Sequence, residues 1–326
     1  MLLEGKTVLI TGGTGSFGRA FARTVLEQDD PRRVIIFSRD ELKQYEMQQE
    51  LKDKRLRFFL GDVRDLERLK RACTDVQVIV HAAALKQVPA AEYNPFECIK
   101  TNVLGGQNVI DAAVSTGVEK VIALSTDKAA NPVNLYGATK LCSDKLFVAG
   151  NAYSSARGPR MAVVRYGNVV GSRGSVIPFF LEARKNGKIP ITDPRMTRFL
   201  ITLDQGVQFV LDSLRRMRGG ELFVPRIPSA SIMTIVEALA PDCETEIVGI
   251  RPGEKLHELM ISEDDARRTR DMGSYYLLQP QTSWWDDANV EAGLPVPEGF
   301  SYRSDSNPHF LTKDEIQEMV EDLVPA

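Results

Sequence analysis

Residues 6–18 decide the fold of this chain and have the sequence Lys-Thr-Val-Leu-Ile-Thr-Gly-Gly-Thr-Gly-Ser-Phe-Gly. Their apolar, β-branched first half predicts a buried strand, and residues 19–28 continue in a helical pattern. Two glycine registers fit the turn between them, Gly12-x-x-Gly15-x-x-Gly18 and Gly13-x-Gly15-x-x-Gly18. Residues without Cβ allow a tight turn and let the backbone approach a pyrophosphate at a helix N-terminus. With a strand before the turn and a helix after it, the sequence predicts a dinucleotide site.

Strands and helices continue to alternate as far as Tyr166. Further predicted strands cover residues 33–38, 56–60, 76–80, 121–124 and 160–166. This alternation predicts an α/β fold, a Rossmann-type doubly wound parallel sheet. After Gly171 the alternation fades, which indicates a smaller C-terminal substrate-binding lobe. We therefore expect a nucleotide-binding domain of residues 1–170, to which a helix within 200–216 returns, and a lobe with a tail formed by 171–199 and 217–326.

The composition is that of an ordinary globular protein. The 326 residues are 43% hydrophobic and 26% charged, with a formal net charge of −3, which gives no reason to expect nucleic acid or an anionic membrane as a partner. No apolar run has the length of a membrane span, and the N-terminus lacks a signal-peptide pattern. Scattered cysteines and widely spaced histidines indicate a cytoplasmic protein without a metal site.

The end of the second predicted strand bears on the choice of dinucleotide. An acidic residue at this position would bond the adenosine ribose of NAD, but Ser38 and Arg39 come first and Asp40 follows. A small residue followed by Arg suits a 2′-phosphate, so the sequence favours NADP. The alternative is that Arg39 pairs with Asp40 or Glu41 in solvent. Asp62, at the end of the third strand, would either meet the adenine amine or cap the next helix.

Residues 125–140 carry the candidate chemistry: Ser-Thr-Asp-Lys-Ala-Ala-Asn-Pro-Val-Asn-Leu-Tyr-Gly-Ala-Thr-Lys. Tyr136 and Lys140 are four residues apart, which places both side chains on one face of a helix. We expect the lysine cation to lower the pKa of the phenol, giving a base that takes a hydroxyl proton while a nicotinamide takes the hydride. Asp127 and Lys128 form an adjacent acid and base at the end of a buried strand, where parallel sheets keep their chemistry.

These motifs resemble the extended short-chain dehydrogenases/reductases that act on nucleotide sugars. Residues 125–140, with Ala-Ala-Leu-Lys-Gln-Val-Pro at 83–89 and Arg-Pro-Gly-Glu-Lys-Leu-His-Glu at 251–258, resemble more narrowly the inverting UDP-N-acetylglucosamine 4,6-dehydratases of the pseudaminic acid pathway. The likeness extends from about Lys6 to at least Tyr276. It implies a UDP-N-acetylglucosamine substrate, NADP as cofactor and a homo-oligomer, as a hexamer.

The resemblance also implies a reaction sequence. Tyr136, held by Lys140 and helped by Thr126, takes the C4 hydroxyl proton while hydride passes to NADP⁺. Lys128 then removes the C5 proton and Asp127 protonates the departing C6 oxygen. Hydride returns to C6, and C5 is reprotonated from the opposite face, giving UDP-2-acetamido-2,6-dideoxy-β-L-arabino-hex-4-ulose. A base lysine must be neutral; nearby cations such as Lys86 lower its pKa and Asp127 raises it, so the residues alone do not decide its state.

The candidate site residues fall into three sets. The catalytic residues are Thr126, Asp127, Lys128, Tyr136 and Lys140. The cofactor-binding residues are Thr11, Gly12, Gly15, Ser16, Phe17, Gly18, Ser38, Arg39, Asp40, Asp62, Val63, Ala82, Ala83, Ala84, Lys86, Asn102, Tyr136, Lys140 and Val169. The substrate-binding residues are Lys86, Asn168, Thr192, Arg198, Arg251 and Glu254.

Two other functions are compatible with the fold. One is a nucleotide-sugar 4-epimerase or a capsule-type dehydratase/epimerase, and the other is a non-catalytic NADP-binding scaffold. An epimerase needs only Tyr136 and Lys140, so the intact Asp127–Lys128 pair argues against it. Intact Thr126, Tyr136 and Lys140 argue against an idle scaffold.

Overall fold

The computed structural model describes residues 1–154, 158–172, 175–281 and 293–321. Its larger lobe is built on a sheet with the strand order β16-β14-β15-β10-β6-β5-β4-β1-β2-β3. The parallel strands of this sheet are β1 (Thr7–Thr11), β2 (Arg33–Ser38), β3 (Leu56–Leu60), β4 (Val78–His81), β5 (Lys120–Thr126), β6 (Arg160–Tyr166) and β10 (Leu222–Pro225). The order reverses at β1, so the predicted doubly wound parallel sheet is confirmed.

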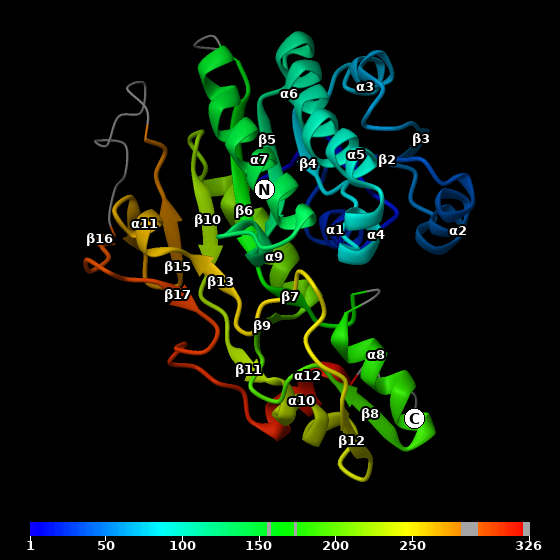
Figure 1. Cartoon of the computed structure of the whole chain (residues 1–326). Helices are drawn as coiled ribbons and strands as arrows, with labels where there is room; N and C mark the ends of the chain where they lie inside the picture. The colour runs from blue at the N-terminus through cyan, green and yellow to red at the C-terminus, as the bar shows by residue number, and fades with distance from the viewer. Residues whose placement is uncertain (155–157, 173–174, 282–292, 322–326) are drawn as a thin grey trace.

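Helices cover both faces of this sheet (Figure 1). On one face α3 (Leu66–Ala72), α6 (Gly105–Thr116) and α7 (Leu135–Gly150) pack together, and on the other α1 (Ser16–Gln28) contacts α9 (Leu203–Arg216). All five residues of β1 are buried and its three central residues are apolar, as expected of a strand that is covered on both faces. The helix α9, which lies within residues 200–216, thus packs against the larger lobe. The second predicted strand is followed by α2 (Glu41–Leu51).

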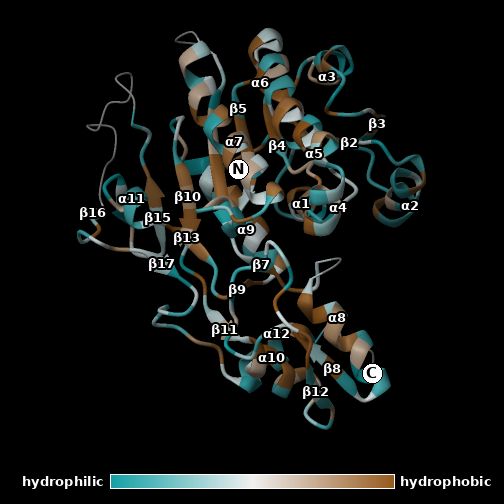
Figure 2. Cartoon of the chain, in the orientation of Figure 1, coloured by the Kyte–Doolittle hydropathy of each residue, from teal (hydrophilic) through white to brown (hydrophobic). Residues whose placement is uncertain are grey.

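The smaller lobe has its own core. It contains β7 (Asn168–Val169), β9 (Thr197–Ile201) and β11 (Ser229–Ser231) in one sheet, β8 (Lys188–Ile191) and β12 (Glu244–Ile247) in another, and helices α8 (Val176–Ala183), α10 (Ile232–Leu239) and α12 (Lys313–Val320). Apolar residues of these elements form a cluster separate from that of the large sheet, and Figure 2 shows brown, hydrophobic residues on α8 and α10. The first strand of this separate cluster of elements, β7, lies just before Gly171 in the chain.

The expected lobe boundary needs one correction. Residues 217–326 were expected in the second lobe, yet β10 lies beside β6, and β15 (Tyr275–Leu278), β14 (Thr269–Asp271) and β16 (Leu294–Pro295) extend the large sheet in antiparallel fashion. The pair β13 (Leu259–Ile261) and β17 (Tyr302–Arg303) also packs its apolar residues into the larger core. These strands are short and separated by loops, so they lack the βα pattern by which the first strands were recognised. Trp284, Trp285 and Arg173 lie outside the described residues.

The helical stretch of residues 95–116 is divided into three parts. It consists of α5 (Pro95–Ile99), a π-helical turn at Lys100–Leu104, and α6. Within that turn Asn102 is buried, accepts a hydrogen bond from the backbone N–H of Leu85 at 2.8 Å, and donates one to the Leu85 carbonyl at 2.9 Å. The irregular turn thus fixes the loop after β4, which precedes the short helix α4 (Val88–Tyr93).

No helix in the described part of the chain combines the length and apolar character required to cross a bilayer.

A pair of helical glycines gives a test of this packing. A Cβ at Gly137 in α7 would collide with the carbonyl oxygen of Lys128, whereas a Cβ at Gly206 in α9 would meet no atom within 4 Å. We expect Gly206→Ala to raise the free energy of unfolding by about 0.5–1 kcal/mol, because alanine has the better helix propensity. Gly137→Ala should lower it by roughly 1–3 kcal/mol through overpacking. Urea unfolding of both variants measures the difference, and equal shifts would contradict the close contact at Gly137.

Candidate active site

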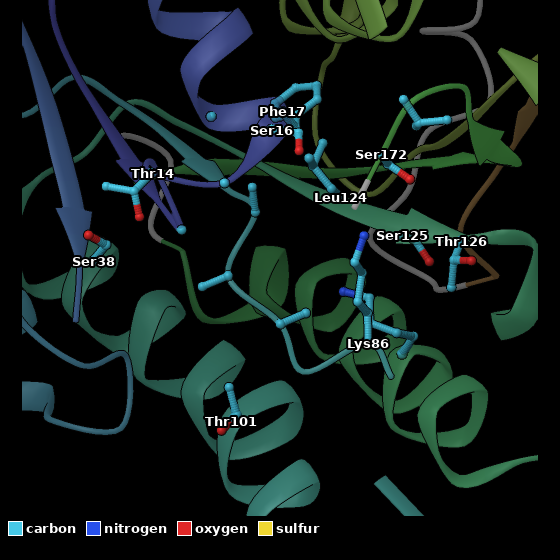
Figure 3. Close-up of a pocket in the computed structure, with 18 of the residues that line it drawn as sticks. Thr14, Ser16, Phe17, Ser38, Lys86, Thr101, Leu124, Ser125, Thr126 and Ser172 are labelled. Carbon is cyan, nitrogen blue, oxygen red and sulfur yellow. The ribbon is translucent and has the colours of Figure 1, made fainter. Parts of the chain in front are cut away.

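A single cavity of about 820 Å³ lies along the carboxyl ends of the parallel strands. Its lining comes from the turn after β1, the ends of β2 and β3, the small residues after β4, the segment after β5, and α7. Figure 3 shows Ser38 toward one end of this cavity and Lys86 and Thr126 toward the other. The turn of residues 12–15 and the catalytic stretch therefore share one space, as ligand sites in doubly wound sheets do.

The glycine turn is shaped by close backbone packing. Gly12 has a φ of +67°, and a Cβ there would lie 2.8 Å from the backbone nitrogen of Ala83. A Cβ at Gly18 would lie 2.5 Å from the Cα of Gly13, so the helix start packs directly on the turn. The N-cap Gly15 provides no side-chain capping bond, and the first turn of α1 contains no acidic residue. Because its first residues line the cavity, this helix N-terminus can bind an anionic group with free backbone N–H donors.

The end of β2 carries the residues from which the sequence analysis inferred the choice of dinucleotide. Ser38, Arg39, Asp40 and Asp62 all line the cavity. The Asp40 carboxylate caps α2 by accepting from the Lys43 backbone N–H at 3.0 Å. Arg39 lies 3.7 Å from Asp62 and its side chain is 56% exposed, so its partner differs from the expected Asp40 or Glu41. Asp62 is mainly engaged by Arg64, and the hydrogen bonds and charge of Arg64 outweigh burial and lower the Asp62 pKa.

The loop after β4 forms part of the cavity wall. Ala82, Ala83, Ala84 and Lys86 line it, and burial lowers the pKa of Lys86. Thr11 and Asn102 lie behind this lining instead of on it: the Thr11 hydroxyl bonds His81 Nδ1 at 2.8 Å, and Asn102 bonds the Leu85 backbone. Their contacts support the shape of the site. Val63 and Val169 line the cavity as predicted.

Tyr136 and Lys140 lie on the same side of α7, and both line the cavity together with Thr126. The helix begins after Asn134, whose side chain accepts from the Gly137 N–H at 2.7 Å. Burial raises the pKa of Tyr136 to about 12, against the opposing attraction of the Lys128 ammonium and a hydrogen bond with Thr126. Burial also lowers the pKa of Lys140. The expectation that the Lys140 cation lowers the pKa of the phenol is therefore wrong for this structure, because desolvation of the phenolate is the larger effect.

Asp127 and Lys128 form part of a buried charge cluster with a third member. The Asp127 carboxylate accepts from the Thr126 hydroxyl at 2.9 Å and from Lys128 Nζ at 3.1 Å. Lys128 Nζ also lies 3.1 Å from Glu258 Oε1. Burial disfavours the ammonium, but the charges of Asp127 and Glu258 outweigh it and raise the Lys128 pKa. The two neighbouring carboxylates thus favour the ammonium form of Lys128 in this arrangement.

The segment 251–258 is attached to residues 130–134 by hydrogen bonds from side chains to backbone carbonyls. Asn134 donates to the Gly253 carbonyl at 2.7 Å, and Lys255 Nζ donates to the Ala130 carbonyl at 2.6 Å. Gly253 has a φ of +80°, a conformation that favours glycine. These bonds bring Glu258 from a distant part of the chain to Lys128.

The predicted substrate residues separate into two groups. Lys86 and Asn168 line the cavity, whereas Thr192, Arg198, Arg251 and Glu254 lie outside its lining. Arg251 pairs with Glu254 at the surface. Arg198 donates to the carbonyls of Thr197, Lys255 and Leu256 and approaches Glu258 to 3.8 Å.

Sequence reasoning missed Glu258, which closes the charge cluster, and Tyr166, which lines the cavity. The signal for Glu258 was available in residues 251–258, where an acidic residue directly precedes the apolar run Leu259-Met260-Ile261. A carboxylate beside a buried strand is rarely placed there without a partner.

Comparison with known proteins agrees with these features. Residues 8–280 match the family model described as polysaccharide biosynthesis protein. The inverting UDP-N-acetylglucosamine 4,6-dehydratase of Campylobacter jejuni subsp. jejuni is 54% identical over 328 residues, covering 98% of both chains. The UDP-glucose 4-epimerase of Rickettsia canadensis is 44% identical, over 84% of this chain and 82% of the relative.

A solved structure extends the likeness to three dimensions. The X-ray structure of Pen from Bacillus thuringiensis superimposes with a TM-score of 0.90 and 35% identity, covering 99% of both chains. The resemblance inferred from residues 125–140 and 251–258 is confirmed by the Campylobacter relative. From its sequence match and its Rossmann-like architecture, the chain belongs to the polysaccharide biosynthesis protein family.

Proposed function

We propose that this protein is an inverting UDP-N-acetylglucosamine 4,6-dehydratase, a carbon–oxygen lyase that uses NADP. The observation that carries the proposal is the Asp127–Lys128 pair, which lines the same cavity as Tyr136, Lys140 and the glycine turn. The Campylobacter relative of that name supports the substrate. The pair provides an acid and a base beyond the Tyr136–Lys140 couple, as elimination of water requires.

The cavity fits a nicotinamide dinucleotide. The turn of residues 12–15 and the N-terminus of α1 would hold the pyrophosphate, and Ser38 with the exposed Arg39 would hold a 2′-phosphate. Small residues 82–84 leave room for the cofactor against the backbone. When bound, an oxidised nicotinamide supplies a two-electron acceptor and a positive charge close to the reacting carbon.

Each proton transfer is assigned to a residue of the chain. Tyr136 Oη takes the C4 hydroxyl proton, with Thr126 and Lys140 beside it. Lys128 Nζ first passes its own proton to the Asp127 carboxylate, 3.1 Å away, and then takes the proton from C5, which the C4 ketone has made acidic. The Asp127 carboxyl gives a proton to the departing C6 oxygen, so that water leaves. Reprotonation of C5 from the opposite face inverts that centre.

The second candidate is a 4-epimerase, which the 44% identical Rickettsia relatives favour. An epimerase moves one proton at C4 and uses only Tyr136 and Lys140. It has no step that requires the buried Asp127–Lys128 pair. Incubation with UDP-N-acetylglucosamine separates the candidates by mass, since only the dehydratase product is lighter by one water.

Single substitutions separate the oxidation at C4 from the elimination of water. Tyr136→Phe removes the phenol without changing the ring, so with substrate it should give neither reduced-nicotinamide absorbance nor deuterium exchange at C5. Lys128→Ala should still reduce the cofactor with substrate bound but lose dehydration by roughly 10²–10⁴-fold, with little exchange at C5. Absorbance and mass spectrometry in deuterated water measure both. The exposed Lys185→Ala serves as the control, and rapid C5 exchange in Lys128→Ala would exclude Lys128 as the base.

The cofactor preference is tested at Arg39. Arg39→Ala should weaken NADP binding by roughly 10-fold or more and leave NAD binding nearly unchanged, because a charged hydrogen bond to a phosphate contributes about 1.5–3 kcal/mol. Calorimetric titration with both dinucleotides measures the difference, with Arg215→Ala as an exposed control. Equal losses for the two cofactors would show that Arg39 does not recognise the 2′-phosphate.

The expected homo-oligomer, a hexamer, has support in exposed aromatic residues. Tyr93 in α4 is 87% exposed and Phe96 in α5 is 60% exposed, which is unusual for residues that gain from burial. We expect an oligomer by light scattering at micromolar concentration, and a smaller assembly for the double variant Tyr93→Ser/Phe96→Ser. A monomeric wild-type protein would refute self-association.

A further inference from the structure

Glu258 is a buried carboxylate that contacts Lys128 behind the lining of the proposed active site. Its exposed fraction is 3%, and it follows the bridge between His257 and Thr197 that joins this segment to β9. Its backbone is fixed on both sides by Ser304, whose hydroxyl accepts from the Glu258 N–H at 2.8 Å and whose N–H donates to the Glu258 carbonyl at 2.9 Å. A carboxylate held this firmly and removed from water needs cationic partners.

The cations around Glu258 come from three different elements. Lys128 Nζ lies 3.1 Å from Glu258 Oε1, and Arg198 Nε lies 3.8 Å from the same oxygen. The charge of Lys255 also attracts the Glu258 carboxylate. Asp127 contacts only Lys128 among these cations, at 3.1 Å. Each carboxylate has a second oxygen, Asp127 Oδ2 and Glu258 Oε2, that is buried without a hydrogen-bond partner, so the two differ in the number of nearby cations. The two carboxylates therefore share one ammonium, but Glu258 is the better compensated of the two.

We propose that Glu258 is a positioning residue that serves as the counterion of Lys128 and thereby allows Asp127 to carry a proton. The inference rests on the proposed dehydratase function, because Asp127 is the group that protonates the departing C6 oxygen. A lysine with Asp127 as its single neighbour would hold that carboxylate ionised and unable to donate. A second carboxylate on the same ammonium removes this constraint, since two negative charges at one buried site oppose each other.

The pKa values of Asp127 and Glu258 are shifted in the directions that this proposal requires. Burial and the neighbouring Glu258 charge raise the Asp127 pKa, although Lys128 and Thr126 oppose them. Burial disfavours ionised Glu258, but Lys128, Arg198 and Lys255 outweigh it and lower the Glu258 pKa. When Asp127 donates, its O–H bond breaks, the proton bonds to the C6 oxygen, and the C6–oxygen electron pair leaves with water. Asp127 then holds the negative charge until it is protonated again.

The variant Glu258→Gln tests the proposal, because it keeps the shape and hydrogen bonding of the side chain and removes its charge. Asp127 then becomes the only counterion of Lys128, so its pKa falls and a smaller fraction is protonated at a given pH. We expect water loss to slow by roughly 10²-fold or more above neutral pH. The alkaline limb of the pH–rate profile should move to lower pH, with KM nearly unchanged. Deuterium exchange at C5, which needs Lys128 but not the acid, should persist.

Two control variants separate the loss of the Glu258 charge from a change in the protein structure. Glu221 is also 3% exposed and binds the backbone N–H groups of Arg218 and Gly219 away from the cavity, so Glu221→Gln should leave the pH profile unchanged. Glu258→Asp keeps the charge and should hold the alkaline limb near its wild-type position. The proposal is overturned if the alkaline limb of the pH–rate profile stays in its wild-type position in Glu258→Gln. It is also overturned if deuterium exchange at C5 and water release slow by the same factor in that variant.

A measurement without substrate separates this proposal from the proposed function. The infrared spectrum of the wild-type protein should contain the band of a protonated carboxyl that titrates at a higher pH than an ordinary aspartate and disappears in Asp127→Asn. Absence of that band overturns the role of Glu258 even if Glu258→Gln does not fold. If the band is present but the wild-type protein releases no water from UDP-N-acetylglucosamine, the proposed function fails and the counterion role stands.

Discussion

The close approach of α7 to the turn after β5 is the constraint on which the site depends. Gly137 lets the helix reach the Lys128 carbonyl, and any larger residue would separate them. Because Tyr136 adjoins this glycine and Lys140 lies one turn further on, the contact brings the phenol and the lysine beside Asp127 and Lys128. One backbone contact therefore sets the distance between Tyr136, the proposed base at C4, and Asp127 and Lys128, the groups proposed to act at C6 and C5.

The segment 251–258 adds the missing charge to this arrangement. It is anchored to the catalytic loop through Asn134 and Ala130, and it delivers Glu258 to Lys128 from a part of the chain more than 100 residues away. The same segment binds Arg198 of β9 through its backbone carbonyls. The segment thus joins β9 of the smaller lobe to the charge cluster around Lys128.

Desolvation governs the chemistry of this cavity. It raises the pKa of Tyr136 and lowers that of Lys140, so the two groups move toward their neutral forms. Within the charge cluster, Lys128 and Glu258 resist the same effect because their opposite charges lie 3.1 Å apart, whereas burial raises the pKa of Asp127. A positive nicotinamide beside Tyr136 would favour the phenolate, which explains why the proposed base is activated only together with its cofactor.

The sequence by itself determined the nucleotide-binding half of the fold and most of the cavity lining. Glycine spacing and β-branched runs are local signals, and the residues that follow parallel strands necessarily meet at one edge of the sheet. The tertiary structure alone decided the strand β10, the supporting positions of Thr11 and Asn102, and the presence of Glu258 at Lys128. These features depend on contacts between distant segments and on burial, and neither is encoded in the spacing of residues along the chain.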